Sequence, residues 1–201
     1  ILMGRSRGYS GSVTIGGAEL REISEESLMR HITYVSHQSY LFKGTVRSNL
    51  AWGDKEAALS DDAAWAALQC AQADDVVKQK GGLDAVVEQG GGNLSGGQKQ
   101  RLSVARALMK DADVLILDDS SSALDYATER ALSNAVRARQ KEKKQTVFIV
   151  SQRASSLITA DKILVLDEGE IIGAGTHEEL LKSCPEYKEI YEFQYGTEAQ
   201  R

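Results

Sequence analysis

The chain has 201 residues with a formal net charge of −5, and 42% of its residues are hydrophobic and 26% charged, an ordinary composition for one α/β domain with or without a small insert. The acidic balance argues against a protein that binds nucleic acid through a basic surface, and no apolar run approaches the roughly 20 residues of a membrane span. Two widely separated cysteines exclude a disulfide framework or a cysteine metal site, which fits a reducing, cytoplasmic setting.

The first third of the chain is expected to alternate short strands and helices. Ser12 to Ile15 lies between glycines and predicts a strand that ends in a turn. Ile23 to Arg30 predicts a short helix, with Ser24 as a possible cap and two glutamates in its first turn. Ile32 to Val35 predicts a partly buried strand. The alanine-rich residues from Ser60 to Val77 favour a single helix.

The stretch from Leu94 to Gln98 organises the rest of the chain. Its paired glycines, Gly96 and Gly97, precede residues 99–109, whose apolar side chains fall at helical spacing. A helix start offers unpaired amides and the positive end of the helix dipole, and glycine lets an anion approach closely. This pattern indicates a phosphate-binding helix start, to which Ser95 adds a hydroxyl donor. The plainer alternative is an ordinary helix with Ser95 as its cap.

A fully apolar run, Val114 to Leu117, predicts a strand buried on both faces and ends in Asp118 and Asp119. Open α/β sheets bind ligands at the carboxyl ends of their strands, and hard cations prefer carboxylate oxygens. Asp118 is therefore a candidate magnesium ligand, although a strand-end carboxylate that caps the next turn is the alternative. Asp125 fits the cap of a helix over Tyr126 to Arg139.

The last part of the chain predicts a second buried strand over Thr146 to Ser151, followed by Gln152. Lys162 to Asp167 and Glu170 to Ala174 predict a hairpin. Thr176 is expected to cap a helix, and His177 belongs to that helix start rather than to a catalytic site. Pro185 to Tyr195 is expected to be helical.

Several of these segments together resemble the ATP-binding cassette (ABC) ATPases. Leu94 to Leu108 resembles the family's signature motif and the helix after it, and Val114 to Asp119 resembles a Walker B motif. Ser36 to Leu50 resembles the Q-loop region of ABC exporters, and Ser121 to Asp125 resembles the D-loop. The resemblance implies an α/β P-loop NTPase of the ABC ATPase type, with a mixed sheet core, an inserted helical subdomain and a small antiparallel β portion.

The resemblance also implies a division of the single cassette domain. Residues 1–43 would be the remainder of the β subdomain with the Q-loop strand, and residues 44–108 the helical subdomain with the signature motif. Residues 109–183 would be the RecA-like core, and 184–201 a C-terminal helix and tail. No segment matches the glycine-rich phosphate loop with its lysine, so the chain is expected to be a piece truncated before or within that region.

The resemblance assigns roles to individual residues, all of them expectations. Asp118 would hold Mg²⁺, and the catalytic positions would be those of Asp119, Gln152 and either His37 or Gln38. The nucleotide-binding set comprises Leu94, Ser95, Gly96, Gly97, Gln98 and Asp125. The family places glutamate where Asp119 stands, histidine where Gln152 stands and glutamine where His37 stands.

These departures lead to a functional hypothesis. The family binds ATP with Mg²⁺ between two cassettes, and each site combines the Walker motifs of one subunit with the signature motif of the other. The combination of altered Walker-side residues with an unaltered signature motif favours the hypothesis that this chain is the degenerate half of a heterodimeric exporter. The cassette would be attached to a transmembrane domain at the cytoplasmic face of the membrane. The alternatives are an active homodimeric exporter ATPase, a soluble non-transport ABC-type ATPase, and a structural module that binds no nucleotide.

Overall fold

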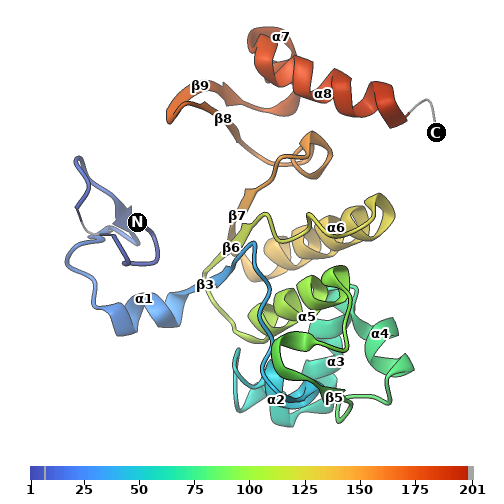
Figure 1. Cartoon of the computed structure of the whole chain (residues 1–201). Coiled ribbons are helices and arrows are strands. Elements are labelled where there is room, and N and C mark those ends of the chain that lie inside the picture. The colour runs from blue at the N-terminus through green and yellow to red at the C-terminus, as the bar shows by residue number, and fades with distance from the viewer. Residues whose placement is uncertain (7, 199–201) are drawn as a thin grey trace. The chain divides into compact units, whose positions relative to one another are not determined.

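The computed structural model describes residues 1–6 and 8–198 and divides into two compact units, Ile1–Val150 and Ser151–Arg201 (Figure 1). Residues 199–201 of the expected C-terminal tail lie outside the described part. The four-segment division expected from the sequence stays a prediction. Within residues 1–6 and 8–198, no helix has the length and apolar character needed to cross a membrane.

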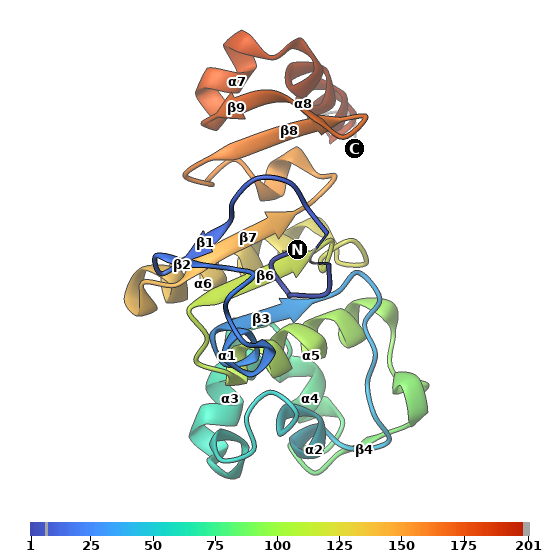
Figure 2. The ribbon, with the colours of Figure 1, turned by 90° about the vertical axis from the view of Figure 1, so that its left-hand side faces the viewer.

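A three-stranded parallel sheet forms the centre of the first unit (Figure 2). Its strands are β3 (Ile32–Val35), β6 (Val114–Asp118) and β7 (Thr146–Val150), with β6 between the other two. The register pairs Val35 with Leu117 and Asp118 with Val150. Because all three strands run in the same direction, their carboxyl ends meet at one edge of the sheet.

Burial of the strands follows their place in the sheet. The middle residues of β6 are buried, as the apolar run predicts. The expectation that the strand over Thr146 to Ser151 is buried is wrong, since Phe148 and Val150 are 45% and 55% exposed. Thr146, Phe148 and Val150 point to one face of the sheet, which is exposed at β7, whereas Val147 and Ile149 on the other face pack against the main apolar core.

The segment before the sheet is a hairpin followed by a helix. Strands β1 (Thr14–Ile15) and β2 (Ala18–Glu19) pair antiparallel across Gly16 and Gly17, whose φ angles of 57° and 84° suit a tight turn. Helix α1 (Glu25–His31) is capped by Ser24, as predicted, and leads directly into β3.

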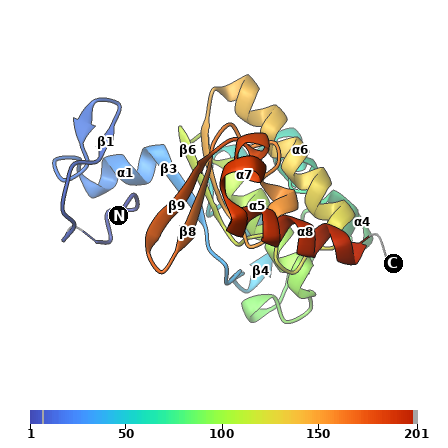
Figure 3. The ribbon, with the colours of Figure 1, turned by 90° about the horizontal axis from the view of Figure 1, so that it is seen from above.

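Four helices form the helical part of this unit (Figures 1 and 3). They are α3 (Asp61–Cys70), α4 (Asp74–Gln79), α5 (Gly96–Met109) and α6 (Tyr126–Lys143). Helix α5 packs against β3, and α3 packs against α5. The remaining elements of this unit are α2 (Val46–Leu50), the pair β4 (Gly44–Thr45) and β5 (Val86–Val87), and the 3₁₀ turns Ala57–Leu59 and Gln89–Gly91.

The single helix expected over Ser60 to Val77 is instead two helices. Helix α3 ends at Cys70, and Gln72 adopts a left-handed conformation with φ of 57° before α4 begins. The backbone amide of Ala73 donates to Leu68, which closes the turn. Ala71 and Ala73 are fully buried, so small side chains at the corner let the two helices pack closely.

The second unit is a hairpin packed against two helices. Strands β8 (Ile163–Asp167) and β9 (Glu170–Gly175) form the predicted hairpin, and a 3₁₀ turn, Ala154–Ser156, precedes it. Thr176 caps α7 (His177–Ser183) as predicted, and α8 (Pro185–Glu198) follows. Figure 3 shows α8 extending away from the hairpin tip. The core of this unit is formed by Ile163, Val165, Leu180, Cys184 and Tyr187.

Candidate functional site

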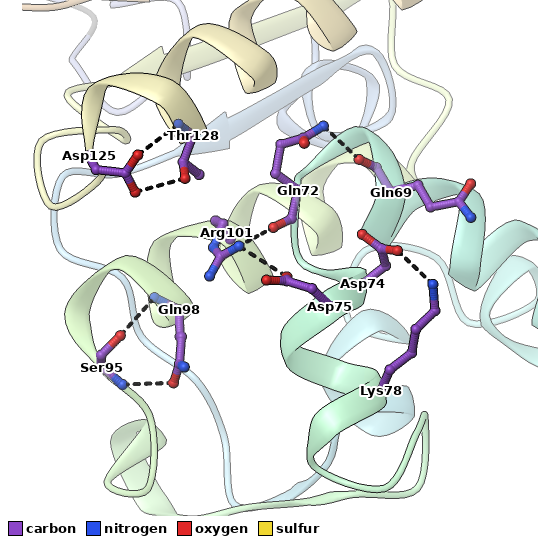
Figure 4. A network of polar contacts seen from close by, with 10 residues as sticks. All are labelled: Gln69, Gln72, Asp74, Asp75, Lys78, Ser95, Gln98, Arg101, Asp125 and Thr128. Atoms are coloured by element: carbon purple, nitrogen blue, oxygen red, sulfur yellow. Dashed lines mark hydrogen bonds and ion pairs between the residues drawn. The ribbon is translucent and has the colours of Figure 1, made fainter.

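The start of α5 is a fully formed helix cap (Figure 4). The amide of Gln98 donates to Ser95 Oγ at 3.3 Å, and the amide of Ser95 donates to Gln98 Oε1 at 3.0 Å. This reciprocal pair is a capping box, which fixes the direction in which the first turn points. The hydroxyl of Ser95 accepts in this pair and can still donate its own proton, as can the first-turn amides of Gly96 and Gly97.

Gly97 brings the helix start close to the loop that follows β6. A Cβ atom at this position would lie 2.9 Å from the carbonyl oxygen of Ala123 and 3.3 Å from Leu124 Cδ2. Buried Gln100 joins the same two segments, since its Nε2 donates to Ser122 Oγ at 3.0 Å and its Oε1 accepts from the amide of Ala123 at 2.9 Å. The helix start and this loop therefore form one packed unit.

A cavity of about 340 Å³ opens at this junction. Its wall is formed by residues of the α5 start and of the loop before α6: Ser95, Gly96, Gly97, Gln98, Arg101, Ala123, Leu124, Asp125 and Thr128. Asp125 caps α6, because its carboxylate accepts from the amide and the hydroxyl of Thr128 at 2.9 and 2.7 Å. These bonds, the backbone one first, hold the pKa of Asp125 below its ordinary value.

Arg101 ties α5 to the corner between α3 and α4. Its guanidinium donates to the carbonyl oxygen of Gln72 and lies 3.1 Å from Asp75 Oδ1 (Figure 4). The left-handed backbone of Gln72 presents that carbonyl. The fixed fork of an arginine suits two acceptors on different segments. Arg101 therefore holds the cavity wall against the neighbouring helices.

The carboxyl end of β6 carries the second group of candidate residues. Tyr34, on the adjacent strand β3, donates its hydroxyl to Asp118 Oδ2 at 2.7 Å. This hydrogen bond is the main cause that raises the pKa of Tyr34, with burial second. Among the described residues no cluster of three metal-ligating side chains occurs. A single carboxylate fits Mg²⁺ nonetheless, because this ion commonly takes one or two carboxylates and completes its shell with phosphates and water.

Asp119 follows directly and lies beside His37. His37 Nδ1 is 3.0 Å from Asp119 Oδ2, and the two side chains are 62% and 23% exposed. Gln38 lines a different cavity of about 230 Å³, together with Trp52, Arg106 and Lys110. The structure thus brings His37 to the strand-end carboxylates, and Gln38 is among the residues that line another cavity.

Two further candidates are Gln152 and Leu94. Gln152 belongs to the second unit, where its carbonyl oxygen accepts from Gln194 Nε2 at 2.8 Å. Leu94 is buried in the apolar core of the first unit, so its side chain anchors the helix start to that core. The structure brings together Ser95, Gly97 and Asp125 at one cavity, and His37, Asp118 and Asp119 at the strand ends.

A parallel sheet with carboxylates at the carboxyl ends of its strands, together with a capped glycine helix start, is an arrangement typical of phosphate-binding α/β proteins. The family model described as ABC transporter matches residues 1–122. The chain therefore belongs to the ABC transporter family.

Individual relatives agree with this assignment. An uncharacterized ABC transporter ATP-binding protein, YfiB of Bacillus subtilis (strain 168), is 43% identical over 189 residues, which are 94% of this chain and 32% of the relative. An ATP-dependent lipid A-core flippase of Haemophilus ducreyi is 40% identical over 187 residues, covering 92% and 32%. A solved bacterial Atm1-family ABC exporter with ATP bound matches with a TM-score of 0.85 at 33% identity, covering 92% and 32%. The ABC ATPase fold expected from the sequence is confirmed, and the chain spans about a third of the length of these relatives.

Two contacts at the site were not predicted from the sequence. Tyr34 is separated from Asp118 by 84 positions, and Arg101 from Gln72 by 29. The alternation of β3 placed Tyr34 on one face of a strand, but only its pairing with β6 brings the hydroxyl to a carboxylate.

Proposed function

We propose that this chain is the ATP-binding cassette of a membrane exporter and works with ATP and Mg²⁺ at the cytoplasmic face of the membrane. Its partners are a transmembrane domain of the same transporter and a second cassette subunit. Two similar proteins, a flippase and an exporter, support the exporter assignment by their names. The observation that carries the proposal is the capped start of α5 with a cavity in front of it.

In this proposal the α5 start serves ATP held by the second subunit. The Ser95 hydroxyl and the amides of Gly96 and Gly97 donate to the terminal phosphate, where negative charge accumulates during attack by water. The capping box keeps these donors aligned before nucleotide arrives, so little reorganisation is needed. Asp125 lies at the same cavity and fixes the loop that faces the second subunit.

The chain's own Walker-side residues would act on a second nucleotide. Asp118 would hold Mg²⁺, which supplies charge neutralisation for the phosphates. Asp119 would orient the attacking water and accept its proton. Aspartate is about 1.5 Å shorter than the glutamate usual in the family, and a misplacement of about 1 Å can cost on the order of 100-fold in rate.

We infer from these substitutions that the chain is the degenerate half of a heterodimer. The amide of Gln152 cannot become cationic as a histidine can, and His37 stands where the family has glutamine. The chain's own site would turn over slowly, whereas its unaltered Ser95 and Gly97 complete a competent site on the second subunit.

The test compares ATP turnover of the full-length assembly after two separate substitutions. Ser95→Arg should abolish most turnover, because it fills the cavity with a long side chain and removes the cap of α5. Asp119→Asn should leave most turnover intact. The matched control is Ser24→Arg, which removes the equivalent cap from α1, far from this cavity in sequence.

Each outcome has a clear meaning. Similar losses from Ser95→Arg and Asp119→Asn would refute the asymmetric assignment and support an active homodimer in which Asp119 is the base. A loss with Ser24→Arg as large as that with Ser95→Arg would show that cap removal alone impairs the protein. ATP turnover by a full-length protein that contains no membrane domain would support a non-transport ATPase.

A further inference from the structure

His37 and Asp119 follow the carboxyl ends of two adjacent strands. His37 lies two residues beyond β3 and Asp119 one residue beyond β6, and the parallel register pairs Val35 with Leu117. This register brings the two side chains together, with Nδ1 of His37 3.0 Å from Oδ2 of Asp119. The pair therefore depends on the sheet itself, not on a mobile loop tip.

The backbone of Asp119 is fixed on both sides. Its amide donates to the carbonyl oxygen of Val150 at 2.9 Å, and its carbonyl oxygen accepts from Ser122 Oγ at 3.1 Å. Its φ of 46° is in the left-handed region, which aspartate tolerates better than most residues. With the backbone fixed, only the two side-chain torsions of Asp119 decide where its carboxylate points.

His37 Nδ1 lies within ion-pair distance of that carboxylate. An imidazole nitrogen that carries a proton attracts a carboxylate oxygen at this distance, which favours one orientation of the carboxylate. The contact engages Oδ2 and leaves Asp119 Oδ1 as the oxygen that can accept a proton from water.

We propose that His37 is a positioning residue for Asp119, holding the short carboxylate in the orientation from which it acts on water. The proposal rests on the proposed function, since it concerns the chain's own nucleotide site. Aspartate at position 119 and histidine at position 37 then form one linked departure from the family pattern, because the histidine holds the shorter acid in place. The slow turnover expected at this site would be the rate that the Asp119 carboxylate supports in the orientation in which His37 holds it.

The competing role for His37 is direct contact with Mg²⁺ or the attacking water, in place of the family's glutamine. The two roles require different atoms of the side chain. Nδ1 contacts Asp119, and the amide nitrogen of asparagine can take the place of Nδ1. The amide nitrogen of glutamine instead takes the place of Nε2. Substitution by each amide therefore distinguishes holding Asp119 from contacting the metal or water.

The test measures hydrolysis at this subunit alone in the full-length assembly. A photoreactive azido-ATP labelled at either the α- or the γ-phosphorus is crosslinked during a single turnover, and the subunit is isolated. The α label measures bound nucleotide, and loss of the γ label relative to the α label measures hydrolysis. His37→Ala should leave the α label unchanged and slow loss of the γ label about tenfold, less than the roughly 100-fold that a misplacement of about 1 Å can cost.

Three further variants complete the design. His37→Asn should restore the rate to within about threefold of wild type, and His37→Ala should cause no further loss when Asp119 is already Asn. The matched control is His31→Ala, because His31 makes the same kind of pair with Asp113 Oδ2 at the amino ends of the same two strands. His31→Ala should leave the rate unchanged.

The opposite results are equally specific. Restoration by His37→Gln rather than His37→Asn, or losses that multiply in the double variant, would overturn the positioning role. Equal loss of both labels with His37→Ala would indicate a purely structural contact and would also overturn it. Absence of the α label from the wild-type subunit would instead refute the proposed function, and the positioning role with it.

Discussion

Replacement of Gly97 by alanine tests the close packing at the start of α5. The new Cβ atom would lie 2.9 Å from the carbonyl oxygen of Ala123, a backbone atom that can move only with its loop. Gly96→Ala is the matched control one residue away, because its Cβ atom would meet only Ala123 Cβ, at 3.5 Å. Both changes replace glycine by alanine in the first turn of the same helix.

The expected effect follows from two opposing terms. Overpacking of a well-packed contact costs about 1–3 kcal/mol, whereas replacing glycine by alanine in a helix gains up to about 1 kcal/mol. Gly97→Ala should therefore destabilise the junction by about 1 kcal/mol, and Gly96→Ala should be neutral or slightly stabilising. A loss of about 1 kcal/mol corresponds to roughly fivefold more frequent local opening.

Amide hydrogen exchange of the full-length protein measures this opening. Peptides covering residues 95–98 and 119–128 should exchange roughly fivefold faster in Gly97→Ala than in wild type. Peptides from β3 should be unchanged in both variants. Equal exchange in Gly96→Ala and Gly97→Ala would refute the argument that the Ala123 carbonyl excludes a side chain at Gly97.

Two other predictions concern the loop beside this helix start. Gln100→Ala should cost about 1–3 kcal/mol of unfolding free energy, because it removes two hydrogen bonds of a buried side chain, each worth about 0.5–1.5 kcal/mol. Urea unfolding of the full-length protein measures this, and a change near zero would contradict the bridging role. The lowered pKa of Asp125 means that its cap stabilises the folded state above the unfolded pKa of about 3.9 and loses this effect as pH falls through the folded value. Asp125→Asn keeps a cap that does not titrate, so wild type should lose stability relative to Asp125→Asn when the urea midpoint is compared between about pH 6 and pH 3. A difference that stays constant over this range would show that the cap does not depend on the charge of Asp125.

Local features of the fold could be predicted from the sequence. Ser24, Ser95, Asp125 and Thr176 all cap helices as expected, because capping depends on residues within one turn. The apolar run of β6 likewise predicted a buried strand, and the middle residues of this central strand are buried.

Features that depend on distant neighbours could not be predicted. Alanine-rich residues favour helix on either side of Gln72, and nothing local to that position required the chain to turn there. The exposure of Phe148 depends on which elements cover its face of the sheet, not on its own apolar sequence.

The same limit applies to the candidate site. The motif spacing identified His37, Asp118 and Asp119 individually as candidates. Their contacts with one another and with Tyr34 depend on the register of β3 against β6, which one sequence does not determine. The sequence placed His37 at the family's glutamine position, with Gln38 as the alternative one residue later. The structure shows His37 beside Asp119 and Gln38 among the residues that line another cavity.

A structure of the ATP-bound full-length assembly tests the central proposal most directly, through the position of Ser95. If the α5 start completes a site on the second subunit, Ser95 Oγ will lie about 2.7–2.8 Å from an oxygen of the terminal phosphate of ATP held by that subunit. Ser95 beyond hydrogen-bonding distance of every bound nucleotide would contradict the proposal.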